Sequence, residues 1–291
     1  MNGWLSLVLA CLSLLSGCAT PRPNPHYELG NSYQVKGFWH YPSESYELNE
    51  TGLATTFPTG HAALTSNGEV FDQSVAMAGH PTLQLPAIAR LTNLENGRSL
   101  LVRINDRGTG DPHRLVEVTP RAAALLAMRG SATPVRLQVL PVESRAAVDG
   151  LPGAPTLAVA AAPRDIVHAT TLSPLPGSRQ EAGNTANTVA PIAAAEPTAV
   201  NQPAKLPETV TQEVLQPGRL WVRLDTFEEY QYAAVQRARV SKLGARIESS
   251  FDRRRHRFWV RIGPLETVRQ ADDALDAALA AGIPDARIVV E

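Results

Sequence analysis

Two acidic residues and one histidine are the candidate groups for proton chemistry in the first half of the chain. Glu69 follows a glycine, Asp106 follows a predicted strand, and His80 lies between them in sequence. Carboxyl and imidazole side chains donate and accept protons in enzyme reactions. We therefore take Asp106, Glu69 and His80 as the candidate catalytic residues.

Each of these residues also has a structural interpretation. In the sequence Asn-Asp-Arg-Gly, Asp106 is typical of a turn residue that accepts backbone N–H groups or pairs with Arg107. Glu69 fits a surface acid after a glycine turn, and His80 fits a loop residue beside a proline. The histidines His61, His80 and His113 lack the close spacing of metal ligands, so we expect no metal site.

Short strands are predicted to position these residues. An Asn-Gly pair at residues 96–97 supplies the backbone freedom that a tight hairpin needs, and apolar runs flank it. Thr119-Pro120 has the composition of a helix start, with threonine as the N-cap and proline in the first turn. The predicted strands are 87–93, 99–105, 114–118 and 135–140, and the predicted helix runs to about residue 128.

The last part of the chain contains an internal repeat. Val222-Arg223-Leu224 with Phe227 recurs as Val260-Arg261-Ile262 with Leu265. Each copy reads as a strand followed by a helix, 228–243 and 266–281, and each helix stops at a glycine. With strands at 245–249 and 286–290, the order becomes βαββαβ, a recurrent α+β motif.

A linker is predicted between these two regions. Residues 142–217 contain ten prolines and no Phe, Tyr or Trp, so they bury too little apolar surface to offset the entropy of ordering.

The net charge of the chain is −1, which gives no basic surface for nucleic acid. The predicted divisions are a leader (1–17), a tether (18–32), a first domain (33–141), a linker (142–217) and a second domain (218–291).

The leader ends in a cysteine that follows a small residue. An apolar run from Trp4 to Leu15 is too short to span a bilayer, which takes about 20 residues, so it reads as a signal peptide. The sequence Leu15-Ser16-Gly17-Cys18 resembles the bacterial lipobox. This resemblance implies a lipidated Cys18 and attachment to a membrane.

Three strings resemble the rare lipoprotein A family: Ser66-Asn67-Gly68-Glu69, and the segments 92–99 and 102–108. The likeness extends over both domains, the lipobox and the linker. It implies two domains: an N-terminal six-stranded double-psi β-barrel, mainly β, and a C-terminal α+β, ferredoxin-like SPOR domain, joined by a disordered linker.

The resemblance also implies an activity. Family members are lytic transglycosylases, which cleave the MurNAc–GlcNAc β-1,4 bond of peptidoglycan without water. One carboxyl group serves as acid and then as base, and the resemblance places this role on Asp106. Glu69 then tunes Asp106 or binds substrate, and His80 orients a carboxylate or binds a sugar hydroxyl. The expected substrate-binding residues are Asn105, Arg107, Trp221, Arg223, Phe227 and Trp259. No cofactor is implied.

The partners follow from the same resemblance. SPOR modules bind glycan strands that lack stem peptides, as found at the division septum. The expected location is the outer membrane facing the periplasm, through the lipid anchor, with division proteins as further partners.

One departure from the family pattern supports other functions. The usual Ser-Trp-Tyr-Gly is replaced by Ala54-Thr55-Thr56-Phe57, which removes two rings that would stack on sugars. A noncatalytic, expansin-like glycan-binding protein is the main alternative, and a structural adaptor of cell division is a third. A hydrolase would also fit the carboxylates. Trp39 and Tyr41 are expected in the core.

Overall fold

The computed structural model describes residues 22–155, 205–215, 217–252 and 255–291. The predicted leader, Cys18 and most of the predicted linker lie outside the described residues. Within the described ranges, no helix combines the length and apolar character needed to cross a membrane.

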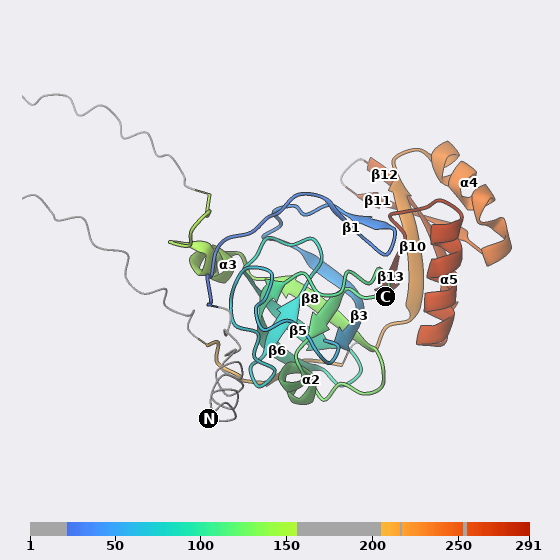
Figure 1. Ribbon diagram of the computed structural model, residues 1–291. Coiled ribbons are helices and arrows are strands. Elements are labelled where there is room, and N and C mark those ends of the chain that lie inside the picture. The colour runs from blue at the N-terminus through green and yellow to red at the C-terminus, as the bar shows by residue number, and fades with distance from the viewer. Residues whose placement is uncertain (1–21, 156–204, 216, 253–254) are drawn as a thin grey trace, which may run out of the picture. The chain divides into compact units, whose positions relative to one another are not determined.

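Six strands form a closed barrel in the first domain (Figure 1). They are β3 (Asn49–Thr56), β4 (Met77–Gly79), β5 (Ala87–Asn93), β6 (Arg98–Asp106), β7 (Val116–Val118) and β8 (Thr133–Val139). Their order is β4-β7-β3-β8-β5-β6, and pairing of β4 with β6 closes the ring. The pairs β3–β7 and β4–β6 are parallel, and the other pairs are antiparallel. The prediction of a six-stranded barrel is confirmed.

Apolar side chains from all six strands fill the barrel. Leu91, Val102, Ile104 and Leu137 are each completely buried, and burial of such side chains is worth about 1.5–3 kcal/mol each. The turn between β5 and β6 follows the prediction, because Gly97 has φ +73° and its N–H donates to the Asn93 carbonyl at 2.8 Å.

Two short helices complete the barrel domain. Helix α2 (Pro120–Leu125) starts as predicted, with the Thr119 side chain accepting the Ala122 N–H. It ends before residue 128 because Ala127 has φ +48°, which is incompatible with a continuing helix. Helix α3 (Pro141–Val148) packs on β5, where the Ser144 hydroxyl accepts from Ile88 N at 2.9 Å.

The predicted linker is therefore shorter than 142–217 at both ends. Helix α3 occupies its first residues, and β9 (Thr211–Gln212) pairs with the start of β6. The predicted tether also differs from the structure. Asn24 N donates to the Gly68 carbonyl at 2.9 Å and His26 N to the Asn67 carbonyl at 3.0 Å, so this part of the predicted tether lies against the barrel domain.

A small hairpin of β1 (Tyr33–Val35) and β2 (Phe38–His40) precedes the barrel strands. Trp39 and Tyr41 are 56% and 66% exposed, with their rings stacked 6.4 Å apart. The expectation that they belong to the core is wrong, because more than half of each residue is exposed to solvent, on the small hairpin and just after it.

The C-terminal domain follows the predicted order of elements. It contains β10 (Leu220–Phe227), α4 (Tyr230–Arg239), a 3₁₀ turn η1 (Ser241–Leu243), β11 (Arg246–Asp252), β12 (Arg255–Leu265), α5 (Val268–Ala280) and β13 (Arg287–Val290). The antiparallel sheet has the order β11-β12-β10-β13. Figure 1 shows α4 and α5 together on one face of this sheet.

The helices of the C-terminal domain cover its apolar core. Val222, Leu224 and Val260 on the strands and Ala233 and Leu275 on the helices are completely buried. Because side chains alternate along a strand, Trp221 and Arg223 project to the opposite face, which the helices leave open.

Candidate active site

Asp106 lies at the end of β6 with its side chain nearly buried, at 4% exposure. Ser66 N donates to Oδ2 at 3.0 Å and Gly108 N donates to Oδ1 at 2.7 Å. These two hydrogen bonds from backbone amides hold the carboxyl group in one orientation. The bond from Gly108 is the one that the turn interpretation predicts. The bond from Ser66, 40 positions away, joins Asp106 to another segment.

A glycine turn brings Ser66 to Asp106. Gly68 has φ +79°, and a Cβ atom there would lie 2.2 Å from the Asn24 carbonyl oxygen, so only glycine fits. The Ser66 hydroxyl accepts the N–H of Arg107 at 3.0 Å. The turn and the end of β6 are therefore linked by two hydrogen bonds, one on either side of Asp106.

Glu69 lies beneath this turn and is 3% exposed. Arg103 donates through Nε to Oε2 at 2.9 Å and through Nη2 to Oε1 at 2.6 Å. Asn105 and Asn67 each donate a further bond at 2.8 Å. Burial alone would raise the pKa of Glu69, but the bonds and charge of Arg103, with the two amides, hold it below its usual range. Glu69 is a buried carboxylate, and the surface-acid interpretation is wrong.

Asn105 serves the Glu69 network and is 1% exposed. Its Oδ1 atom is buried with no hydrogen-bond partner among the described residues. The structure places this predicted substrate-binding residue below the surface of the site.

His80 is buried beside the backbone of Asp106. Its Nδ1 accepts the N–H groups of Thr82 and Leu83, each at 3.2 Å, so the neutral ring carries its proton on Nε2. Burial first, and then the charge of Arg107, lower the pKa of His80 to about 3. The main-chain N–H of His80 donates to the Asp106 carbonyl at 2.9 Å. His80 thus supports the backbone at Asp106, and it is a neutral side chain.

Arg107 fixes backbone segments together. Its Nη2 donates to the Leu29 carbonyl at 2.6 Å, and its Nη1 donates to the Leu83 carbonyl. Burial lowers the pKa of Arg107. The structural interpretation of this residue fits, although its partners are carbonyl groups and not the carboxylate that the sequence suggested.

The ring of His61 beside Asp106, and the two phenylalanine rings packed against it, were missed as site residues. His61 stacks on Phe71 at a centroid distance of 4.0 Å and meets the edge of Phe57 at 4.9 Å. His61 Nε2 lies 3.5 Å from Asp106 Oδ1. In the sequence, His61 was considered only as a metal ligand, and its separation of 45 positions from Asp106 hid the pairing.

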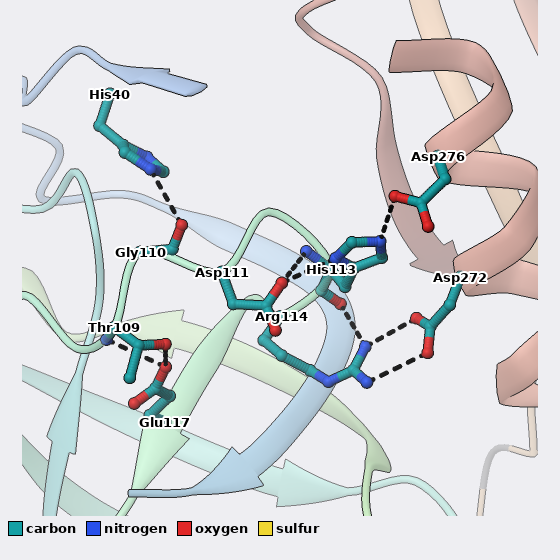
Figure 2. A network of polar contacts seen from close by, with 9 residues as sticks. All are labelled: His40, Thr109, Gly110, Asp111, His113, Arg114, Glu117, Asp272 and Asp276. Atoms are coloured by element: carbon teal, nitrogen blue, oxygen red, sulfur yellow. Dashed lines mark hydrogen bonds and ion pairs between the residues drawn. The ribbon is translucent and has the colours of Figure 1, made fainter. Parts of the chain in front are cut away.

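Glu117 on β7 was also missed as a site residue (Figure 2). It is 5% exposed and accepts bonds from the N–H of Thr109, at 3.0 Å, and from its hydroxyl. Burial raises the pKa of Glu117, and the charges of Asp111 and Asp106 act in the same direction. Its Oε2 has no hydrogen-bond partner in the described part of the chain. Glu117 is therefore a second buried carboxyl group close to the loop after Asp106.

Figure 2 also shows how that loop is held. His40 Nε2 lies 3.1 Å from the Gly110 carbonyl oxygen, and Asp111 accepts the N–H of His113 at 2.9 Å.

Within the described residues, no group of three or more His, Cys, Asp or Glu side chains is arranged to hold a metal ion.

The open face of the C-terminal sheet carries a second cluster of polar and aromatic residues. The Arg261 guanidinium lies 4.0 Å from the centre of the Trp221 ring. Arg223 donates to Glu291 at 2.8 Å, and Arg261 contacts both Glu291 and Glu248. A hollow of about 360 Å³ is lined by Arg223, Glu248, Trp259, Arg261 and Glu291.

Three of the four predicted binding residues of this domain lie on that face: Trp221, Arg223 and Trp259. The fourth, Phe227, packs against the apolar core of the domain. The β-bulge between Arg223 and Asp225 changes the side-chain alternation and turns Phe227 toward the core.

Residues 49–143 match a family model described as lytic transglycolase. Three relatives bear the name "Endolytic peptidoglycan transglycosylase RlpA". The protein from Rickettsia bellii is 34% identical over 108 residues, 36% of this chain and 48% of the relative. The protein from Campylobacter jejuni is 38% identical over 112 residues, which are 37% of this chain and 40% of the relative. The protein from Pseudomonas aeruginosa strain UCBPP-PA14 is 37% identical over 110 residues, which are 37% of this chain and 32% of the relative.

The chain thus spans less than half the length of these three relatives, and the family match lies within the barrel domain. That domain is also the one that carries Glu69, His80 and Asp106. By its sequence matches and its closed six-stranded barrel, the first domain of this chain is similar to the rare lipoprotein A family.

Proposed function

We propose that the barrel is a peptidoglycan lytic transglycosylase that cleaves the MurNAc–GlcNAc β-1,4 bond and leaves 1,6-anhydro-MurNAc ends. The observation that carries this proposal is the rigid position of Asp106, held by Ser66 N and Gly108 N in a barrel of this family. The names of the relatives support the same reaction.

The reaction needs one carboxyl group that acts twice. The protonated Asp106 carboxyl donates its proton to the glycosidic oxygen as the bond from the muramyl C1 atom breaks. The 6-hydroxyl oxygen of the same sugar bonds to C1, and its proton passes to the Asp106 carboxylate. The acid is thereby regenerated without water, unlike in glycosidases that use two carboxyl groups.

The two backbone amides suit the second half of this cycle. They stabilise the carboxylate that must accept the proton of the 6-hydroxyl group. Glu69 has a different role, because Arg103 and two amides keep it charged and fully bonded. We assign to Glu69 the support of the turn and the end of β6, and the reaction itself to Asp106.

The C-terminal domain is proposed to be a SPOR module with a ferredoxin-like fold that binds glycan strands without stem peptides. Its βαββαβ order and the half-buried cluster of Trp221, Arg223, Trp259 and Arg261 around the hollow support this assignment. Aromatic rings and guanidinium groups stack on, and donate hydrogen bonds to, sugar rings and hydroxyls.

The location is proposed from the sequence. A lipidated Cys18 would anchor the chain in the outer membrane facing the periplasm, and the C-terminal domain would concentrate it at the division septum, near division proteins. A Cys18→Ala variant is expected to leave the membrane fraction. If it still partitions with membranes, the anchor is refuted.

A noncatalytic, expansin-like glycan-binding protein is the second candidate. Thr55 and Thr56 stand where the family has a Trp-Tyr pair, so the barrel lacks two rings that would hold the sugar beside Asp106. In this case Asp106 and Glu69 would only bind sugar hydroxyls and support the surrounding structure, without taking part in a reaction.

Mass spectrometry of the products from peptidoglycan sacculi distinguishes the two candidates. Residues 19–291, which include every described residue, would be incubated with intact and with amidase-stripped sacculi. Release of 1,6-anhydro-muramyl products that is lost in Asp106→Asn would establish the transglycosylase. Binding to stripped sacculi without any product would establish the binding protein, and products with reducing MurNAc ends would establish a hydrolase.

A further inference from the structure

The ring of His61 is fixed against two phenylalanines. It stacks on Phe71 at a centroid distance of 4.0 Å with an angle of 26° between planes, and it forms a T-shaped pair with Phe57 at 4.9 Å and 73°. The two phenylalanines pack on each other at 5.1 Å. The side chain is 13% exposed. Such contacts leave the imidazole little freedom to rotate.

The orientation of the ring follows from its backbone contact. His61 Nδ1 lies 3.0 Å from the Ala62 carbonyl oxygen. A carbonyl oxygen only accepts hydrogen bonds, so Nδ1 carries a proton. In a neutral ring the other nitrogen, Nε2, is then an acceptor. That nitrogen faces Asp106 Oδ1 at 3.5 Å.

Two acceptors that face each other repel unless a proton lies between them. The other bonds of Asp106 come from Ser66 N and Gly108 N, neither of which contributes a mobile proton. The facing pair therefore needs one additional proton, either on Asp106 Oδ1 or on His61 Nε2. The distance of 3.5 Å is long for a hydrogen bond, as is common for catalytic pairs before substrate binds.

We propose that His61 is a positioning residue that shares one proton with Asp106 and so keeps available the proton that the reaction consumes. This inference rests on the proposed transglycosylase function. In the cycle, the Asp106 carboxyl gives its proton to the leaving oxygen, and the proton of the 6-hydroxyl group returns to Asp106. The pair holds one proton before and after the reaction, so no other reactant is needed.

Other titratable groups act on Asp106 without meeting the His61 ring. The charges of Tyr33, Arg107 and Glu117 interact with that of Asp106. The stacked neighbours of His61 are uncharged phenylalanines, so Asp106 is the ionisable group whose contact with the ring is described above.

The first test measures the protonation of His61 by nuclear magnetic resonance of residues 19–291. Long-range ¹H–¹⁵N spectra distinguish the two ring nitrogens, and His61→Gln assigns the signals. We expect the Nε2 signal of the native ring to differ from that of the ring in Asp106→Asn, because only the native protein places a shared proton between Nε2 and the Asp106 carboxyl group. Identical behaviour in the two proteins would overturn the proposal, even in a fully active enzyme.

The second test is kinetic and compares His61→Gln with His113→Gln. Glutamine keeps a polar, planar group but holds no additional proton. We expect kcat of His61→Gln to fall about 10²-fold, with KM changed less than threefold, because proton transfer from a side chain contributes about 10²–10⁴-fold. Unchanged kcat would overturn the proposal.

His113→Gln is the matched control for both measurements. His113 also faces a carboxylate, with Nδ1 2.7 Å from Asp111 Oδ1, and its side chain is 20% exposed. We expect native activity and an unchanged His61 spectrum. If the native protein proves inactive while His61 and Asp106 still share a proton, the proposed function fails and the proton pair stands.

Discussion

The barrel site and the open face of the C-terminal sheet use charged residues in different ways. In the barrel, Glu69 and Asp106 are at most 4% exposed, and fixed amides or Arg103 bond to their carboxylate oxygens. On the sheet, Arg261 meets Glu248 and Glu291, whose side chains are about 40% exposed. Buried pairs are costly to break, whereas exposed pairs separate at little cost. The barrel is thus built to hold atoms still, and the sheet face is able to exchange its own partners for a ligand.

The largest effect is expected for Glu69→Ala in the barrel. Removing the carboxylate leaves Arg103 buried without its partner, which costs about 3–5 kcal/mol of unfolding free energy. Urea unfolding would measure the change. The matched variant is Glu248→Ala, which removes one exposed partner of Arg261 and should cost less than about 1 kcal/mol. Equal losses in the two variants would contradict the comparison.

A moderate effect is expected for Trp221→Ala on the sheet face. Removal of the ring eliminates the cation–π contact with Arg261, worth about 0.5–2 kcal/mol, and one stacking surface for sugar. Binding to amidase-stripped sacculi, measured by co-sedimentation, should weaken about tenfold. Product formation from soluble glycan chains should stay at the native rate, and a loss there would show that the two regions are not separable.

A smaller effect is expected in the dependence of barrel stability on pH. The pKa of Glu69 is lowered from 4.5 in the folded protein. Its contribution to the free energy of unfolding is therefore complete above pH 4.5 and is lost as the pH falls through the pKa of the folded state. The pKa of Glu117 is raised from 4.5, so the protein loses stability as the pH rises from 4.5 through the folded value. Urea midpoints between pH 4 and 7 should therefore rise for Glu117→Gln relative to native toward the upper end.

The control for this measurement is Glu143→Gln, on an exposed position of α3. Its midpoints should run parallel to those of the native chain. If Glu117→Gln also runs parallel, the burial of Glu117 has no energetic consequence.

The smallest effect is expected for Trp39→Ala. Loss of a buried tryptophan costs about 3–5 kcal/mol, but the ring is 56% exposed and substitutions at such surface positions stay within about 0.5 kcal/mol. Thermal unfolding would test this. A loss of more than about 2 kcal/mol in the free energy of unfolding would mean that Trp39 is buried, as the sequence suggested.

Local features of the fold were predictable from the sequence, and distant pairings were not. The hairpin at Gly97 and the helix start at Thr119 depend on neighbouring residues alone, and both are confirmed. The pairing of Glu69 with Arg103 joins positions 34 apart, and barrel closure creates it. His61 was likewise invisible as a partner of Asp106, because no pattern along the chain relates the two.

The contact of Asn24 with Gly68 limits how far the barrel can lie from a lipid anchor at Cys18. The backbone is bound to the turn of the candidate active site six residues after Cys18, and six residues extend at most about 20 Å. In a chain lipidated at Cys18, the candidate active site would therefore stay close to the membrane, and under the proposed function it would reach only the glycan nearest to that membrane. A force applied to the anchor would act first on the hydrogen bond between Asn24 and Gly68, in the turn that orients Asp106.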